Sequence, residues 1–217
     1  MNLLDFARGP GLQWALTVFL FGMTWRLAGI LLLRRKTDFS VARTGDWWFG
    51  AFRLIVQRSL PRREFASATG YPLALSYLFH IGLVIILFGL NQHILLLRAY
   101  TGISWSNLPS GLVNLAAAVT AAAMVALLIR RLSHPVLRLI SNFDDYFSWL
   151  VAFLPVATGM LAVAHLGGRY ENLLAIHILS AELLLVWFPF GKLMHASLIF
   201  LSRGTSGALL TRKGAAI

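Results

Sequence analysis

The 217-residue sequence contains no cysteine. Without thiolate ligands, the chain on its own cannot bind an iron–sulfur cluster or a thiolate-linked haem. If electrons pass through this protein, they must therefore reach iron–sulfur clusters that belong to another subunit.

Charged residues are also scarce. They make up 12% of the chain, whereas 58% of the residues are hydrophobic and the mean hydropathy is +0.73. This composition is too apolar for an ordinary soluble domain and predicts one integral membrane unit over residues 1–217. The net charge of +11 forms no basic stripe on a soluble surface, so we expect no nucleic acid partner.

Five stretches are long and apolar enough to cross a bilayer as helices. They are residues 12–33, 73–97, 112–129, 147–166 and 173–201. We therefore expect an all-α fold, an integral membrane five-helix bundle surrounded by membrane lipid. Residues 46–60 interleave aromatic and aliphatic side chains with arginines, which predicts a helix lying in the membrane interface.

Lysine and arginine gather on alternate connections between these stretches. One side has only Arg8, Arg98 and Arg169. By the positive-inside rule, we expect the N-terminus outside and the C-terminus in the cytoplasm, in a multi-pass protein of a bacterial or archaeal inner membrane. The first and third connections and the C-terminal tail carry Arg34, Arg35, Lys36, Arg43, Arg53, Arg58, Arg62, Arg63, Arg130, Arg131, Arg138, Arg203, Arg212 and Lys213.

The last apolar stretch contains two histidines, His177 and His195, and we expect a bend at Pro189 between them that sets the angle at which His195 meets its partner helix. In a continuous α-helix this spacing places both imidazoles on one face, at heights about 27 Å apart. The hydrocarbon core of a bilayer is about 30 Å thick. Each histidine can thus ligate one haem iron, provided that another helix supplies a second axial ligand for each.

The second apolar stretch supplies the candidate partners, His80 and His93. Because it runs antiparallel to the fifth stretch, we expect His80 at the level of His195 and His93 at the level of His177. In an ideal helix, however, His80 and His93 lie about 140° apart around the axis. Either Gly89 permits a local irregularity, or the two haems lie on different flanks of the helix.

Several other residues allow two interpretations. Gly82 and Gly89 suit either a close-lying macrocycle or ordinary helix packing. His165, at the outer end of the fourth stretch, is the rival ligand for the outer haem, whereas His134 is expected to be a solvated loop residue. Arg26 lies within the first stretch, where it either snorkels or meets a haem propionate.

Three carboxylates complete the candidate set. Asp144 and Asp145 begin the fourth stretch, where acidic residues stabilise a helix N-terminus, and we favour this structural role over catalysis. Glu182 lies within the fifth stretch, where burial favours its neutral form. It is either a proton acceptor for a quinol or a hydrogen-bonding partner of a neighbouring helix.

Several motifs match one known pattern. They are FLFGMTWR in the first stretch, Phe79 to Gly82, RRL followed by Pro135 and Arg138, and His177 followed by FPF, Lys192, Leu193 and His195. Through them the chain resembles, over nearly its whole length, the gamma subunit of respiratory nitrate reductase and its relatives.

The resemblance implies a dihaem cytochrome b. In that family two b haems, each bound by two histidines, carry electrons between the quinone pool, menaquinone or ubiquinone, and a cytoplasmic iron–sulfur subunit. It implies that His80 and His195 hold the inner haem and His177 the outer. The family's remaining histidine falls here on Leu90, so His93 is assigned by its chemistry. This departure and the long first connection resemble the branch that serves heterodisulfide-reductase-like or sulfur-metabolising complexes.

A quinol site at the outer level needs polar groups among apolar ones. Asn91, Gln92, Asn107 and Asn114 are candidates. Two other classes of function compete with the cytochrome. One is a small transporter or proton relay that uses His177, Glu182 and His195, and the other is a structural membrane anchor for a peripheral enzyme.

Overall fold

The computed structural model describes residues 2–34 and 39–215, and the regular structure within these ranges is all helical. The all-α prediction is therefore confirmed. Arg35 and Lys36, which count toward the predicted orientation, lie outside the described residues. In chain order the elements are α1 (Leu3–Phe6), the π-helical turn η1 (Ala7–Gly11), α2 (Leu12–Leu31), α3 (Trp47–Gln57), η2 (Arg63–Phe65), α4 (Ala66–Gly89), α5 (Asn91–Thr101), α6 (Ser110–Ser133), α7 (Pro135–Ile140), α8 (Phe143–Ala164), α9 (Tyr170–Trp187), η3 (Lys192–Met194) and α10 (His195–Arg212).

Five helical segments are long and apolar enough to cross a membrane, and each overlaps one predicted stretch. The fourth begins earlier than predicted because Asn142 and Asp145 form a reciprocal capping box at its first turn. The segments are Leu3–Leu31, Arg63–Gly89, Ser110–Ser133, Phe143–Ala164 and Tyr170–Trp187.

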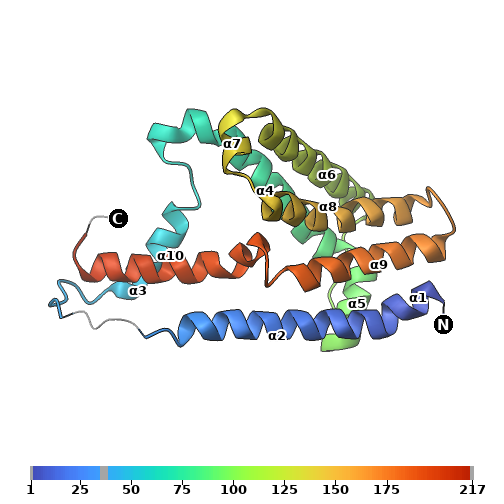
Figure 1. Cartoon of the computed structure of the whole chain (residues 1–217), viewed down its shortest axis with the longest axis horizontal. Coiled ribbons are helices and arrows are strands. Elements are labelled where there is room, and N and C mark those ends of the chain that lie inside the picture. The colour runs from blue at the N-terminus through green and yellow to red at the C-terminus, as the bar shows by residue number, and fades with distance from the viewer. Residues whose placement is uncertain (1, 35–38, 216–217) are drawn as a thin grey trace.

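The spans pack in a row. α2 packs on α9, α9 on α8, α8 on α6, and α6 on α4. In this packing order α6 and α8 lie between α4 and α9, the helices that carry His80 and His177. In the described part of the chain, neither α4 nor α5 packs closely along α9 or α10. Figure 1 shows α9 and α10 end to end along the long axis, with α2 beside α9.

The second predicted stretch is two helices rather than one. α4 ends at Gly89, Leu90 is extended, and α5 begins at Asn91. The connection before α6 causes this break by taking two backbone carbonyls. The Trp105 indole donates to the Phe88 carbonyl at 2.6 Å, and the Leu108 N–H donates to the Gly89 carbonyl at 2.9 Å. The irregularity expected near Gly89 is therefore present.

The fifth predicted stretch, residues 173–201, is also interrupted, and where a bend at Pro189 was expected the helix ends completely. α9 ends at Trp187, and α10 begins only at His195. Pro189 has no N–H to donate, and Gly191 is extended. Because the helix is broken, the ideal-helix calculation that placed His177 and His195 on one face does not apply.

Two glycines of α4 serve packing. A methyl group at Gly82 would collide with the Thr120 hydroxyl on α6, and one at Gly89 would lie 2.8 Å from Leu108 Cδ1. The absence of a side chain thus lets α6 and the connection before it approach α4. Of the two interpretations of these glycines, the structure favours helix packing.

The segment expected at the membrane interface forms α3, which packs along α10. Gly50 and Gly207 make this contact close, because a methyl group on either would meet the other helix. The opposite side of α3 leaves Trp48 72% and Phe52 65% exposed. The predicted helix is confirmed, and its position at the interface stays a prediction.

Candidate functional site

The structure brings His80 and His195 together. His80 lies on α4 and His195 opens α10, and their ring centroids are 6.1 Å apart with the planes at 89°. Each ring is held through Nδ1 by a carbonyl of its own helix or turn. His80 Nδ1 lies 2.7 Å from the Ser76 carbonyl, and His195 Nδ1 lies 2.8 Å from the Lys192 carbonyl.

His93 and His177 form a second pair. His93 on α5 and His177 on α9 have ring centroids 6.1 Å apart, with planes at 23°. His93 Nδ1 lies 2.9 Å from the Ile86 carbonyl, across the break between α4 and α5. His177 Nδ1 lies 3.3 Å from the Thr158 hydroxyl on α8, and a Cβ at Gly159 would lie 3.0 Å from its Cε1. A glycine at position 159 therefore makes room for this ring.

Both pairs have the spacing of two imidazoles that share one metal. A metal–imidazole bond is about 2.0–2.1 Å and a ring centroid lies about 1.1 Å behind its nitrogen, so two rings on opposite sides of one metal have centroids about 6.3 Å apart. Engagement of Nδ1 by a carbonyl, as in His80, His93 and His195, fixes the tautomer that presents Nε2 to a metal.

A bare metal ion has too few ligands at either pair. Within residues 2–34 and 39–215, no group of three or more His, Cys, Asp or Glu side chains is arranged to hold an ion. A haem fits this donor set, because its macrocycle supplies four equatorial nitrogens and leaves two axial positions.

Arg26 lines the same hollow as His195. The hollow is open, has a volume of about 640 Å³, and lies between α2 and the start of α10. Asp144, Lys192 and apolar residues of α10 also line it. Arg26 thus lies beside a candidate axial ligand, in a hollow where Lys192 Nζ is bound by Asp145 and Asp144 adds a negative charge.

Glu182 faces the first span. It is 6% exposed, and its Oε1 has no hydrogen-bond partner among the described residues. It lies against Gly11 at the end of the π-turn, where an added Cβ would be 2.7 Å from Glu182 Oε2. Helix geometry turns Glu182 about 140° away from His177 around α9. Its carboxyl group is thus sealed between α9 and the N-terminal helix.

The polar residues proposed to bond a quinone, namely Asn91, Gln92, Asn107 and Asn114, are all exposed around the start of α5 and of α6. A pocket of about 410 Å³ lies elsewhere, between α8 and α9. It is lined by Thr158, which contacts His177, and by apolar side chains such as Leu173. The sequence gives no signal for this pocket, because apart from Thr158 its lining residues are ordinary apolar residues of α8, α9 and the connection between them.

The other two histidines stand apart from the pairs. His165 follows the end of α8 and stacks on Tyr170 with ring centroids 5.1 Å apart. His134 is exposed between α6 and α7, as predicted. His165 therefore contacts neither His93 nor His177 in this structure.

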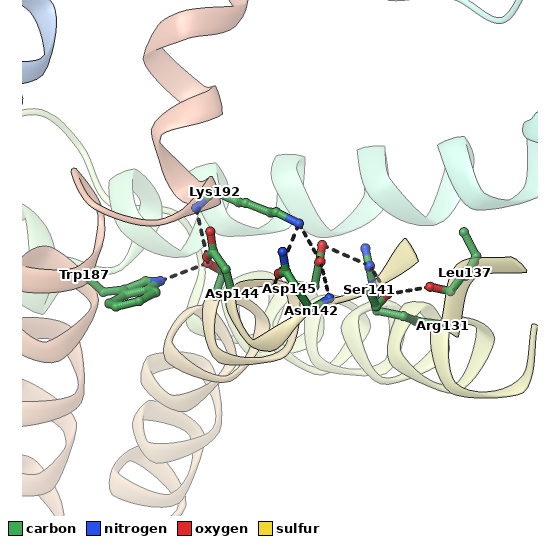
Figure 2. Close-up of polar contacts among 9 residues, drawn as sticks. Arg131, Leu137, Ser141, Asn142, Asp144, Asp145, Trp187 and Lys192 are labelled. Carbon is green, nitrogen blue, oxygen red and sulfur yellow. Dashed lines mark hydrogen bonds and ion pairs between the residues drawn. The ribbon is translucent and has the colours of Figure 1, made fainter. Parts of the chain in front are cut away.

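A polar cluster surrounds Lys192 at the start of α8 (Figure 2). Asp145 binds both Lys192 Nζ and Arg131, the latter at 3.1 Å. Asp144 accepts a hydrogen bond from the Lys192 backbone N–H at 3.1 Å. The predicted helix-capping role is confirmed for Asp145, but both carboxylates also bind the turn that precedes His195.

No known family model matches the chain. A protein from Nitratidesulfovibrio vulgaris (Hildenborough strain) is 35% identical over 131 residues, which are 60% of this chain. The match spans 58% of that protein, little more than half of its length. This likeness assigns no activity.

Proposed function

We propose that this chain is a dihaem b-type cytochrome, the membrane subunit that transfers electrons between the quinone pool and a cytoplasmic iron–sulfur subunit of a respiratory oxidoreductase complex. The observation that carries the proposal is the pair of 6.1 Å imidazole–imidazole spacings between helices that do not otherwise pack together. The proposal places the protein with the nitrate reductase gamma subunit and its relatives, including the sulfur-metabolising branch.

In this proposal His80 and His195 hold one haem iron, and His93 and His177 hold the other. A haem with two imidazole ligands has no open coordination position and supplies one-electron transfer. The chain contributes the orientation of the four rings, which backbone carbonyls and the Thr158 hydroxyl support. Arg26 would supply positive charge for a propionate of the haem at His195, whereas Lys192 Nζ is bound by Asp145.

The orientation in the membrane is part of the proposal. Basic residues put the C-terminus and the His195 end in the cytoplasm, so His80 and His195 hold the inner haem. The same basic connections offer a surface for an acidic iron–sulfur partner. The outer pair would hold the haem nearer to the quinol, and the inner pair would hold the haem nearer to the iron–sulfur partner.

Quinol oxidation is proposed at the outer level, near His93 and His177. The pocket between α8 and α9 supports this location, because it is apolar and Thr158 links it to His177. Glu182 is the candidate proton acceptor, since its buried carboxyl group has an oxygen without a described hydrogen-bond partner. It faces the N-terminal helix and not this pocket, so the proton would have to reach it around α9. The quinone is menaquinone or ubiquinone.

A reduced-minus-oxidised absorption spectrum of the purified protein tests the proposal. We expect a b-type haem spectrum and two haems for each chain by pyridine haemochrome assay. A folded but colourless protein would refute it and would favour a transporter, a proton relay or a structural anchor. Subunits that copurify should include an iron–sulfur protein.

A further inference from the structure

The turn between α9 and α10 is held on both sides by one carboxylate of α8. Asp144 Oδ1 accepts hydrogen bonds from the Lys192 backbone N–H at 3.1 Å and from the Ser148 hydroxyl at 2.6 Å. The Ser148 oxygen in turn accepts from the Trp187 indole N–H at 2.9 Å. Figure 2 shows Trp187 and Lys192 converging on Asp144 from the two ends of the break.

The connection continues from Lys192 to the histidine. The Lys192 carbonyl accepts a hydrogen bond from His195 Nδ1–H at 2.8 Å, because a carbonyl can only accept. That bond leaves Nε2 as the nitrogen available to a metal. Both backbone groups of Lys192 are thus engaged, its N–H by Asp144 and its carbonyl by the ring of His195.

We propose that Asp144 is a positioning residue for His195, acting through the backbone of Lys192 to set the orientation of the imidazole opposite His80. This inference rests on the proposed function for the identity of the bound group. Outer-shell partners of a metal-bound histidine typically change metal affinity or activity by about 10–100-fold when they are removed. Asp144 does not bond the imidazole itself: it accepts a hydrogen bond from the Lys192 N–H, and the Lys192 carbonyl accepts one from the His195 ring.

Asp145 provides a matched control on the same turn of α8. It binds Lys192 through the side-chain Nζ and binds Arg131, so it does not contact the Lys192 backbone. The two carboxylates differ in charge environment, because Lys192 and Arg131 balance Asp145 and only Asp144 lines the hollow beside His195. Asp145→Asn therefore controls for a general disturbance of the turn, and a readout of the angle between the imidazole planes separates ring orientation from an effect of charge.

The test uses the full-length, haem-loaded protein with Asp144→Ala, Asp144→Asn and Asp145→Asn. The low-spin EPR signal of a ferric bis-imidazole haem depends on the angle between its imidazole planes, and the two pairs have angles of 89° and 23°. We expect two separable signals in the wild type. Asp144→Ala should shift the signal of the near-perpendicular haem and weaken its retention about tenfold, while the other signal stays unchanged.

Asp145→Asn should leave the position of both EPR signals unchanged. Asp144→Asn keeps an acceptor oxygen, so the protein should fold and show a smaller shift in the same direction. If Asp144→Ala does not accumulate, Asp144→Asn decides the question. An inner-haem signal that stays at its wild-type position in the folded Asp144 variants would overturn the inference, as would an equal shift in Asp145→Asn. A wild-type protein without haem would instead refute the proposed function.

Discussion

A methyl group at Gly22 is expected to disturb the turn that precedes His195. Gly22 is buried in α2, where an added Cβ would lie 2.6 Å from Pro189 Cγ and 2.8 Å from Pro189 Cβ. The proline ring cannot rotate away, and Pro189 itself is among the most completely buried side chains. Gly29 lies on the same helix with nothing within 4 Å of its added Cβ, so Gly29→Ala is the matched control.

The two variants separate packing from helix propensity. Replacing glycine by alanine within a helix favours folding by up to about 1 kcal/mol at either position. Overpacking at Gly22 costs about 1–3 kcal/mol, so Gly22→Ala should be less stable than Gly29→Ala by about that amount. Thermal unfolding in detergent, followed by circular dichroism, measures the difference. If the two variants unfold at the same temperature, α2 does not press on the α9–α10 turn as the structure indicates.

Three further predictions concern the ligands, the topology and the proton. His80→Ala and His195→Ala should each remove the same haem, and His93→Ala and His177→Ala should each remove the other, because each change removes one of two axial ligands. A redox titration that sorts the four variants differently would contradict the pairing. A C-terminal fluorescent-protein fusion should glow and an alkaline-phosphatase fusion stay inactive, and the opposite result would reverse the orientation. Glu182→Gln should slow quinol-driven haem reduction and weaken the pH dependence of its rate, since the amide cannot accept the quinol proton. An unchanged rate and pH profile, with both haems present, would remove Glu182 from the mechanism.

The histidine pairs could be predicted from the sequence because antiparallel helices bring residues of equal depth to one level. That rule needs only the approximate span limits and the direction of each span. It correctly joined His80 with His195 and His93 with His177. The rule does not exclude His165, the rival ligand at the same level, which in the structure stacks on Tyr170.

The helix breaks could not be located in the same way, because they depend on groups distant in sequence. The break after Gly89 requires the Trp105 indole and the Leu108 N–H, which compete for the carbonyls of α4. The break after Trp187 is held by Asp144, which lies 48 positions before Lys192. Local propensity marks Gly89 and Pro189 as weak points, but tertiary hydrogen bonds decide that the helices end there.

The order in which the spans pack against one another could not be predicted from the sequence either. All five are apolar over most of their surface, so the sequence of a span does not indicate which of its faces packs against which other span. Small residues decide the contacts, such as Gly82 against Thr120 on α6 and Gly11 against Glu182 on α9. Since glycine is common in membrane helices, its presence does not reveal which helix it meets.

The two breaks explain how both histidine pairs form at once. In ideal helices, His80 and His93 differ in height by about 20 Å and His177 and His195 by about 27 Å, so aligning one pair would separate the other by about 7 Å. His80 and His93 would also point about 140° apart. The break after Gly89 frees His93 to turn toward α9, and its ring bonds the Ile86 carbonyl across the break.

The break between α9 and α10 likewise frees His195 to turn toward His80. The turn between α9 and α10 ends in η3, whose Lys192 carbonyl receives the His195 ring. Each pair therefore joins a histidine of a long span, His80 on α4 or His177 on α9, to one that follows a break, His195 or His93. One member of each pair is fixed by its span and the other is adjusted by its turn, so the two spacings can both reach 6.1 Å despite unequal helical rises.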